Sequence, residues 1–132
     1  TYHESAEELL KVSDFLSLHC PLAPGTKYFL NEERIALLPE NSVVINTARG
    51  PIIEDEALIA ALKSGRVAAA GLDVFDGEPK LNPGYRDCKN AFLLPHLGSA
   101  TIETRNAMGF TALDNLDAIF AGKELKILFQ RW

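Results

Sequence analysis

Four short apolar runs alternate with stretches of helical periodicity along the chain. The apolar runs have the length of strands, end at polar or turn-forming residues, and stay apolar throughout instead of at every second position. Such runs are typical of parallel strands that helices cover on both faces, because every side chain of the strand is then buried. The sequence therefore predicts an α/β fold with strands at 14–19, 42–46, 67–75 and 91–95 and helices at 5–11, 31–38, 54–65 and about 101–120.

The predicted helices have recognisable ends. Ser5 with Glu8 three positions later resembles a capping box, and Asn31 is a good N-cap in front of acidic residues that suit the helix dipole. Gly65 and Gly122 stand where helices commonly end. The segment 122–132 is apolar and basic and continues no pattern, so we expect it to be an atypical tail.

Composition is that of an ordinary globular domain. The 132 residues are 47% hydrophobic and 23% charged, with a formal net charge of -5. There is no basic stripe, so we expect no nucleic-acid partner. No apolar run approaches the ~20 residues that cross a bilayer, and the first residues show no signal-peptide pattern, so we expect a cytoplasmic protein without a membrane partner. Cys20 and Cys88 are far apart and lack paired metal-ligand spacing, which gives a disulfide or a metal site little support.

Polar side chains follow each predicted strand at the point where it ends. The carboxyl ends of parallel strands share one edge of a sheet, so we expect these side chains to be neighbours. A guanidinium binds a carboxylate through two bonds, a histidine exchanges a proton near neutral pH, and a nearby carboxylate orients that histidine. Arg49, Glu78 and His96 in one cleft would suit acid/base chemistry on a small anionic substrate. The residues that follow the strands are His19, Cys20 and Pro21; Thr47 and Arg49; Asp73, Asp76 and Glu78; and His96.

Each of these three residues also has a structural interpretation. Arg49 could pair with Glu54 or Asp55 at the start of the next helix. His96 could hydrogen-bond a loop carbonyl, and Glu78 could be a solvated turn acid. The residues alone leave these alternatives open.

Four motifs resemble those of one known family. They are DFLSLHCPL, VINTARGPIIEDEALIAALKSG, AAGLDVFDGEP and LLPHLGSAT, and they occur in order within about residues 1–121. At these motifs the chain is similar to the D-isomer-specific 2-hydroxyacid dehydrogenases, which include phosphoglycerate, glyoxylate/hydroxypyruvate and formate dehydrogenases. The resemblance implies that residues 1–121 are the carboxyl-terminal part of a dinucleotide-binding domain, with the last four strands of a Rossmann-like, doubly wound parallel sheet. It also implies hydride transfer between NAD or NADP and a small 2-hydroxy or 2-oxo acid.

The same resemblance implies a role for each site residue. Arg49 matches the arginine that holds the carboxylate and carbonyl oxygen of the 2-oxo acid, His96 matches the general acid/base at the C2 oxygen, and Glu78 matches the carboxylate paired with that histidine. Asp73 matches the acid that contacts the nicotinamide carboxamide. The other residues implied to line the cofactor are His19, Cys20, Pro21, Thr47, Ala48 and Gly98, together with Arg49 and His96.

Several expected parts of a family enzyme are not in these 132 residues. The nine glycines do not form the G-x-G-x-x-G turn that receives the dinucleotide pyrophosphate, and the acid that would select NAD over NADP and the substrate domain are also missing. We therefore expect the isolated chain to be inactive, to leave the strand at 14–19 on an open edge, and to form homo-oligomers.

Two alternatives remain open beside a dehydrogenase. One is a non-enzymatic, NAD-binding corepressor-like interaction protein, and the other is an inactive truncated product. For a dehydrogenase, general likeness favours glyoxylate or hydroxypyruvate as the substrate.

Overall fold

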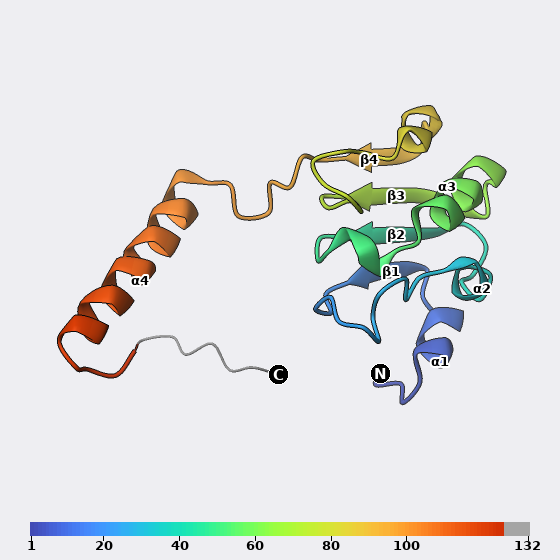
Figure 1. Ribbon diagram of the computed structural model, residues 1–132. Coiled ribbons are helices and arrows are strands. Elements are labelled where there is room, and N and C mark those ends of the chain that lie inside the picture. The colour runs from blue at the N-terminus through green and yellow to red at the C-terminus, as the bar shows by residue number, and fades with distance from the viewer. Residues whose placement is uncertain (126–132) are drawn as a thin grey trace. The chain divides into compact units, whose positions relative to one another are not determined.

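Four parallel strands form one sheet in the computed structural model, which describes residues 1–125 (Figure 1). The strands lie side by side in chain order, with β1 and β4 at the two edges. The predicted α/β fold with an all-parallel sheet is thus confirmed. The strands are β1 (Phe15–Leu18), β2 (Ser42–Asn46), β3 (Val67–Leu72) and β4 (Ala91–Leu93), and the helices are α1 (Ala6–Lys11), α2 (Glu32–Ile35), α3 (Asp55–Ser64) and α4 (Ile102–Phe120), with short 3₁₀ turns η1 (Gly50–Ile52) and η2 (Pro83–Asp87).

The predicted helix ends are confirmed by their hydrogen bonds. The Ser5 hydroxyl accepts a hydrogen bond from the Glu8 N–H at 3.1 Å, and the Asn31 side-chain oxygen accepts one from the Arg34 N–H at 3.0 Å. Gly65 ends α3 with a φ of 79°, a left-handed conformation that favours glycine. Local sequence signals therefore set where these helices begin and end.

Four elements are shorter than predicted, and β1 contains only Phe15–Leu18 of the expected 14–19. Helix α2 ends at Ile35 because the chain turns before Pro39, and β4 ends at Leu93. Strand β3 ends at Leu72, so Asp73 and the residues after it leave the sheet and form a loop. Of the predicted tail, residues 126–132 lie outside the described residues.

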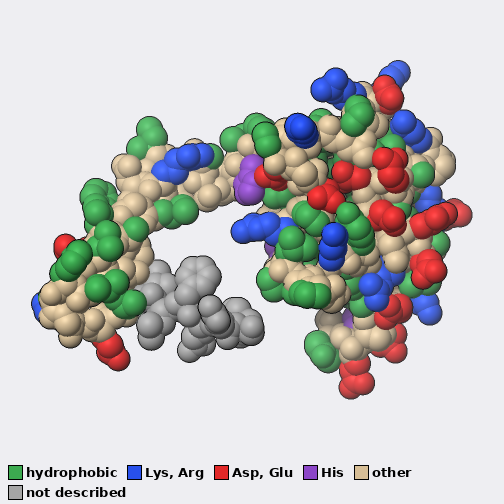
Figure 2. All heavy atoms as spheres, in the orientation of Figure 1, with side chains coloured by type: hydrophobic (Ala, Val, Ile, Leu, Met, Phe, Trp, Pro, Cys, Tyr) green, Lys and Arg blue, Asp and Glu red, His purple; other side chains and the backbone are tan. Residues whose placement is uncertain are grey.

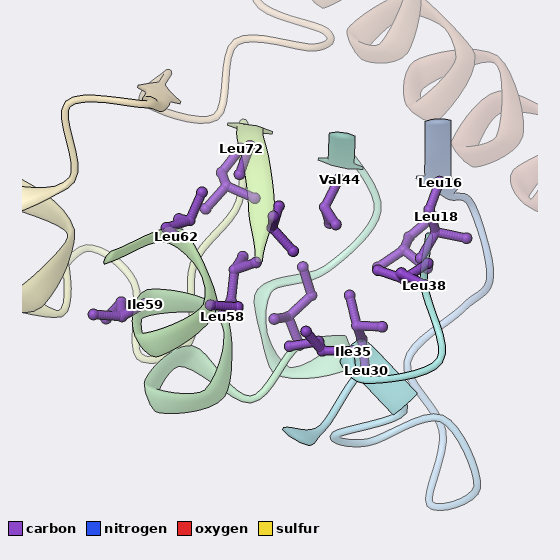
Figure 3. Packing of buried hydrophobic residues seen from close by; sticks show 14 of the residues in the cluster. Leu16, Leu18, Leu30, Ile35, Leu38, Val44, Leu58, Ile59, Leu62 and Leu72 are labelled. Carbon is purple, nitrogen blue, oxygen red and sulfur yellow. The ribbon is translucent and has the colours of Figure 1, made fainter. Parts of the chain in front are cut away.

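The hydrophobic core lies on one face of the sheet. Burial alternates along β1, where Leu16 and Leu18 are buried while Phe15 is 74% exposed. Side chains of α3, including Leu58, pack toward the strands (Figure 3). Within the first 96 residues the opposite face has no comparable buried cluster, so cover on both faces is not seen in this part of the chain.

The chain divides into two compact units, Thr1–His96 and the residues from Leu97 onward. The second unit contains α4, which begins at the N-cap Thr101 and exposes apolar side chains such as Phe110 and Leu113 along its length (Figure 2). None of the helices described here combines the length and the apolar character needed to cross a membrane.

Gly50 brings two loops of the first unit into backbone contact. It begins η1 directly after the β2 loop and is buried. A Cβ atom at this position would overlap the backbone of Phe75 and Asp76 in the loop after β3. Only glycine allows the two loops to lie this close.

Gly50→Ala is therefore expected to lower the free energy of unfolding by about 3 kcal/mol, because the two backbones must separate. Urea denaturation of the wild type and the variant measures this change. Gly25→Ala is the matched control, because nothing lies within 4 Å of a Cβ there. Equal stability of the two variants would contradict the close contact at Gly50.

Candidate active site

Glu78 and His96 form a hydrogen-bonded pair at the carboxyl ends of β3 and β4. The His96 Nδ1 lies 2.8 Å from Glu78 Oε2. The other carboxylate oxygen, Oε1, accepts a hydrogen bond from the Phe75 backbone N–H at 2.7 Å. Glu78 is thus anchored to its own loop through one oxygen and holds His96 through the other.

This geometry determines which nitrogen of His96 carries a hydrogen. A carboxylate only accepts hydrogen bonds, so Nδ1 is the donor, and Nε2 is the nitrogen that can exchange a proton with a ligand. The His96 side chain is 49% exposed and that of Glu78 is 34% exposed, which leaves the pair accessible to a small molecule.

The surroundings of Glu78 keep its carboxyl ionised. Partial burial raises its pKa, but the hydrogen bonds from His96 and from the Phe75 N–H outweigh this effect, and the pKa of Glu78 lies below its ordinary value of 4.5. A group with a lowered folded-state pKa stabilises the fold above its ordinary pKa and loses that contribution as the pH falls through the lowered value. The Glu78 carboxylate therefore makes this contribution at neutral pH.

A pocket of about 590 Å³ lies beside this pair. Its wall is mainly apolar and comes from the loop after β3 and the end of β4. Apolar walls with a few polar groups are typical of small-molecule sites. The residues that line it are Phe75, Glu78, Pro79, Leu81, Leu93, Leu94, Pro95 and His96.

A second hollow of about 450 Å³ lies at the carboxyl ends of β1 and β2. It brings together all the cofactor-lining residues that were predicted from these two strand ends. His19 is exposed there, and its Nε2 lies 2.8 Å from the Ser17 hydroxyl. The residues that line the hollow are His19, Cys20, Pro21, Leu22, Thr47, Ala48 and Arg49.

Arg49 is exposed in this second hollow, whereas Glu78 and His96 line the first. These pockets do not test whether all three residues surround one substrate, so that stays a prediction. The Arg49 Nη1 donates to the carbonyl of Ala48 at 2.6 Å. No ion pair joins Arg49 to Glu54 or Asp55 within residues 1–125, so the structural alternative for Arg49 gains no support.

The three remaining predicted residues have different surroundings. Asp73 is buried, with 5% exposure, and its charge acts on the nearby Glu78. Asp76 accepts a hydrogen bond from the Tyr28 hydroxyl at 2.9 Å, and this bond raises the pKa of Tyr28. Gly98 belongs to the second unit, so its contact with a cofactor stays a prediction.

Asn46 is a further residue at this edge, and it was not predicted from the sequence. It is the last residue of β2 and is only 1% exposed, and its side chain bonds to the loop that carries Thr47 and Arg49. The available signal was a polar residue that ends an apolar strand just before the candidate arginine.

Comparison with known proteins gives a consistent result. Residues 1–98 match the family model described as the D-isomer specific 2-hydroxyacid dehydrogenase, NAD binding domain. The chain is 48% identical over 125 residues to a glycerate dehydrogenase from Hyphomicrobium methylovorum, covering 95% of this chain and 39% of that protein. It is 46% identical over 117 residues to a glyoxylate reductase from Thermococcus litoralis, covering 89% of this chain and 35% of the relative.

Solved structures of related proteins share the fold. An NADPH-dependent glyoxylate/hydroxypyruvate reductase from Sinorhizobium meliloti, in complex with NADP and malonate, superposes with a TM-score of 0.91 at 36% identity, over 96% of this chain and 40% of that one. A 2-hydroxyacid dehydrogenase from Ketogulonicigenium vulgare Y25 superposes with a TM-score of 0.89 at 41% identity, over 99% of this chain and 42% of that one. The chain thus spans less than half the length of the relatives it matches. It belongs to the D-isomer specific 2-hydroxyacid dehydrogenase family, within the NAD-binding domain.

Proposed function

We propose that the protein carrying this chain transfers a hydride between NAD(P) and a small 2-hydroxy or 2-oxo acid. The observation that carries the proposal is the Glu78–His96 pair at 2.8 Å, beside an accessible, mainly apolar pocket. A histidine held by an ionised carboxylate is suited to general acid/base catalysis near neutral pH.

In this proposal each residue acts on the substrate in a defined way. During reduction His96 donates its Nε2 proton to the C2 oxygen, and Glu78 stabilises the imidazolium before the transfer. During oxidation the neutral ring accepts the hydroxyl proton. Arg49 binds the substrate carboxylate, because a guanidinium can form two parallel bonds with it.

The nicotinamide cofactor, when bound, supplies the hydride. The hollow lined by His19, Thr47 and Arg49 fits the nicotinamide side of such a molecule, because it lies outside the carboxyl ends of parallel strands, where open α/β sheets bind ligands. Asp73 is the acid proposed to contact the carboxamide. A glycine-rich turn for the pyrophosphate does not occur among these 132 residues.

We infer glyoxylate or hydroxypyruvate as the substrate. The support comes from relatives named glyoxylate reductase and glyoxylate/hydroxypyruvate reductase. The reductase from Sinorhizobium meliloti was solved with NADP and malonate, a small carboxylate. Activity assays with both oxo acids and both reduced cofactors, on the full-length protein, test this choice.

Replacing His96 is expected to lower kcat by about 10²- to 10⁴-fold in the full-length protein, because a positioned acid/base group is lost. His96→Asn is preferable to His96→Ala, because His96 has a φ of 56° and asparagine tolerates this conformation. Steady-state kinetics with the 2-oxo acid measure the effect, and His3→Ala is the control. Turnover within a few-fold of wild type would remove His96 from the mechanism.

Glu78→Gln is expected to lower kcat/KM for the 2-oxo acid at least tenfold, because a neutral amide bonds to the His96 ring more weakly than the carboxylate does. Its free energy of unfolding should fall less in acid than that of the wild type, because the wild-type carboxylate has a lowered pKa and loses its stabilising contribution as the pH falls through that value. Steady-state kinetics and urea denaturation between about pH 3 and 7, with Glu8→Gln as a surface control, measure both effects. Unchanged kcat/KM would show that Glu78 does not support the histidine.

The isolated 132-residue chain is expected to bind dinucleotides weakly and to self-associate. It lacks the glycine-rich turn, and β1 lies at a sheet edge, where an unpaired strand is a template for pairing. Calorimetric titration with NADH and NADPH and light scattering measure both properties. Micromolar binding by a strictly monomeric chain would contradict this expectation.

A further inference from the structure

Asn46 is a buried polar residue whose side chain is fully engaged with the loop that carries Arg49. Its Nδ2 donates to the Arg49 carbonyl at 3.0 Å, and its Oδ1 accepts from the Ala48 N–H at 3.0 Å. We propose that Asn46 is a positioning residue that holds the Arg49 loop in the conformation that binds the substrate carboxylate. This inference rests on the proposed function of Arg49.

The two hydrogen bonds determine how the Asn46 amide is oriented. An amide rotated by 180° would place its NH₂ against the Ala48 N–H and its oxygen against the Arg49 carbonyl, so both bonds would be lost. Only an amide of this length offers a donor and an acceptor to these two backbone groups at once. A carboxylate could accept from Ala48 but would repel the Arg49 carbonyl.

Other contacts also restrain the Arg49 loop. Thr47 and Arg49 are exposed, while the small side chain of Ala48 packs against the core. The Arg49 carbonyl also accepts from the Ile52 N–H at 3.3 Å, and the following Gly50 packs on the backbone of Phe75. Among the residues of the sheet, Asn46 is the one whose described side-chain hydrogen bonds reach the backbone of this loop.

Asn46 also connects this loop to the one that carries Glu78. Its backbone carbonyl accepts a hydrogen bond from the Asp73 N–H at 3.0 Å, one step beyond the β2–β3 pairing of Asn46 with Leu72. One residue thus sets where both loops leave the sheet. A shift of Arg49 by about 1 Å would be enough to cost a large factor in rate.

Loss of the amide should lower both stability and activity. The Asn46 side chain is buried, so in Asn46→Ala the Ala48 N–H loses its partner and the loop loses its fixed conformation. In the full-length protein we expect kcat/KM for the 2-oxo acid to fall at least tenfold, mainly through a higher KM. Val44→Ala is the matched control, because it removes buried contacts from the same strand without touching the loop. It should lower Tm and keep kcat/KM within about twofold.

A double-mutant cycle with Arg49→Lys separates positioning from a general structural role. If Asn46 acts through Arg49, adding Asn46→Ala to Arg49→Lys should lower kcat/KM by no more than about threefold. The proposal would be overturned if kcat/KM of the double variant fell by the product of the two single-variant losses. Asn46→Ser, which keeps a hydroxyl in the buried site, serves the same cycle if Asn46→Ala does not fold.

The outcomes also distinguish this inference from the proposed function. Wild-type kcat/KM in Asn46→Ala, with a damaging Arg49→Lys, would overturn only the positioning role of Asn46. Wild-type kcat/KM in Arg49→Lys would remove Arg49 from substrate binding, and the positioning role would fall with it. A tenfold loss in Asn46→Ala that Val44→Ala does not reproduce, and that largely disappears in the Arg49→Lys background, supports the inference.

Discussion

The backbone contact between Gly50 and Phe75–Asp76 is the constraint on which the geometry of the site depends. Strands β2 and β3 pair in parallel, so the loops that follow them leave the sheet side by side. Without a side chain at residue 50, these loops approach until their backbones touch. The N–H that anchors Glu78 comes from Phe75, whose carbonyl group lies against Gly50, so the packing of the two loops helps to place the carboxylate.

Exposure distinguishes the carboxylate of the site from a structural one. Asp55 accepts a hydrogen bond from the Tyr85 hydroxyl at 2.8 Å, much as Glu78 bonds to His96. Tyr85 is only 1% exposed, and burial raises the pKa of both Tyr85 and Asp55. That pair holds η2 against α3, whereas the half-exposed Glu78–His96 pair can reach a ligand, and the pKa of Glu78 is lowered.

Local signals in the sequence predicted most of the fold. The caps at Ser5, Asn31 and Gly65 and the apolar runs located the elements within a few residues, because capping and burial of a strand depend on nearby positions. The pairing of Glu78 with His96 could be predicted because both residues follow strands of one parallel sheet. The role of Asn46 could not be predicted, because its side chain bonds to two backbone groups whose orientation only the folded loop provides. Strand order places Arg49 at the same edge as Glu78 and His96 but does not determine which pocket it lines, so its position around one substrate with them stays a prediction.

The site loops are held by backbone-directed hydrogen bonds, while the core is held by buried apolar side chains. Leu16, Val44 and Leu58 belong to this core. Asn46 belongs to both regions, because its backbone extends the pairing toward β3 and its amide reaches the exposed loop. A buried residue with both functions connects the register of the sheet to the placement of Arg49. Substitutions elsewhere in the core can therefore change stability without moving the arginine, and Asn46 is the position where the two effects are coupled.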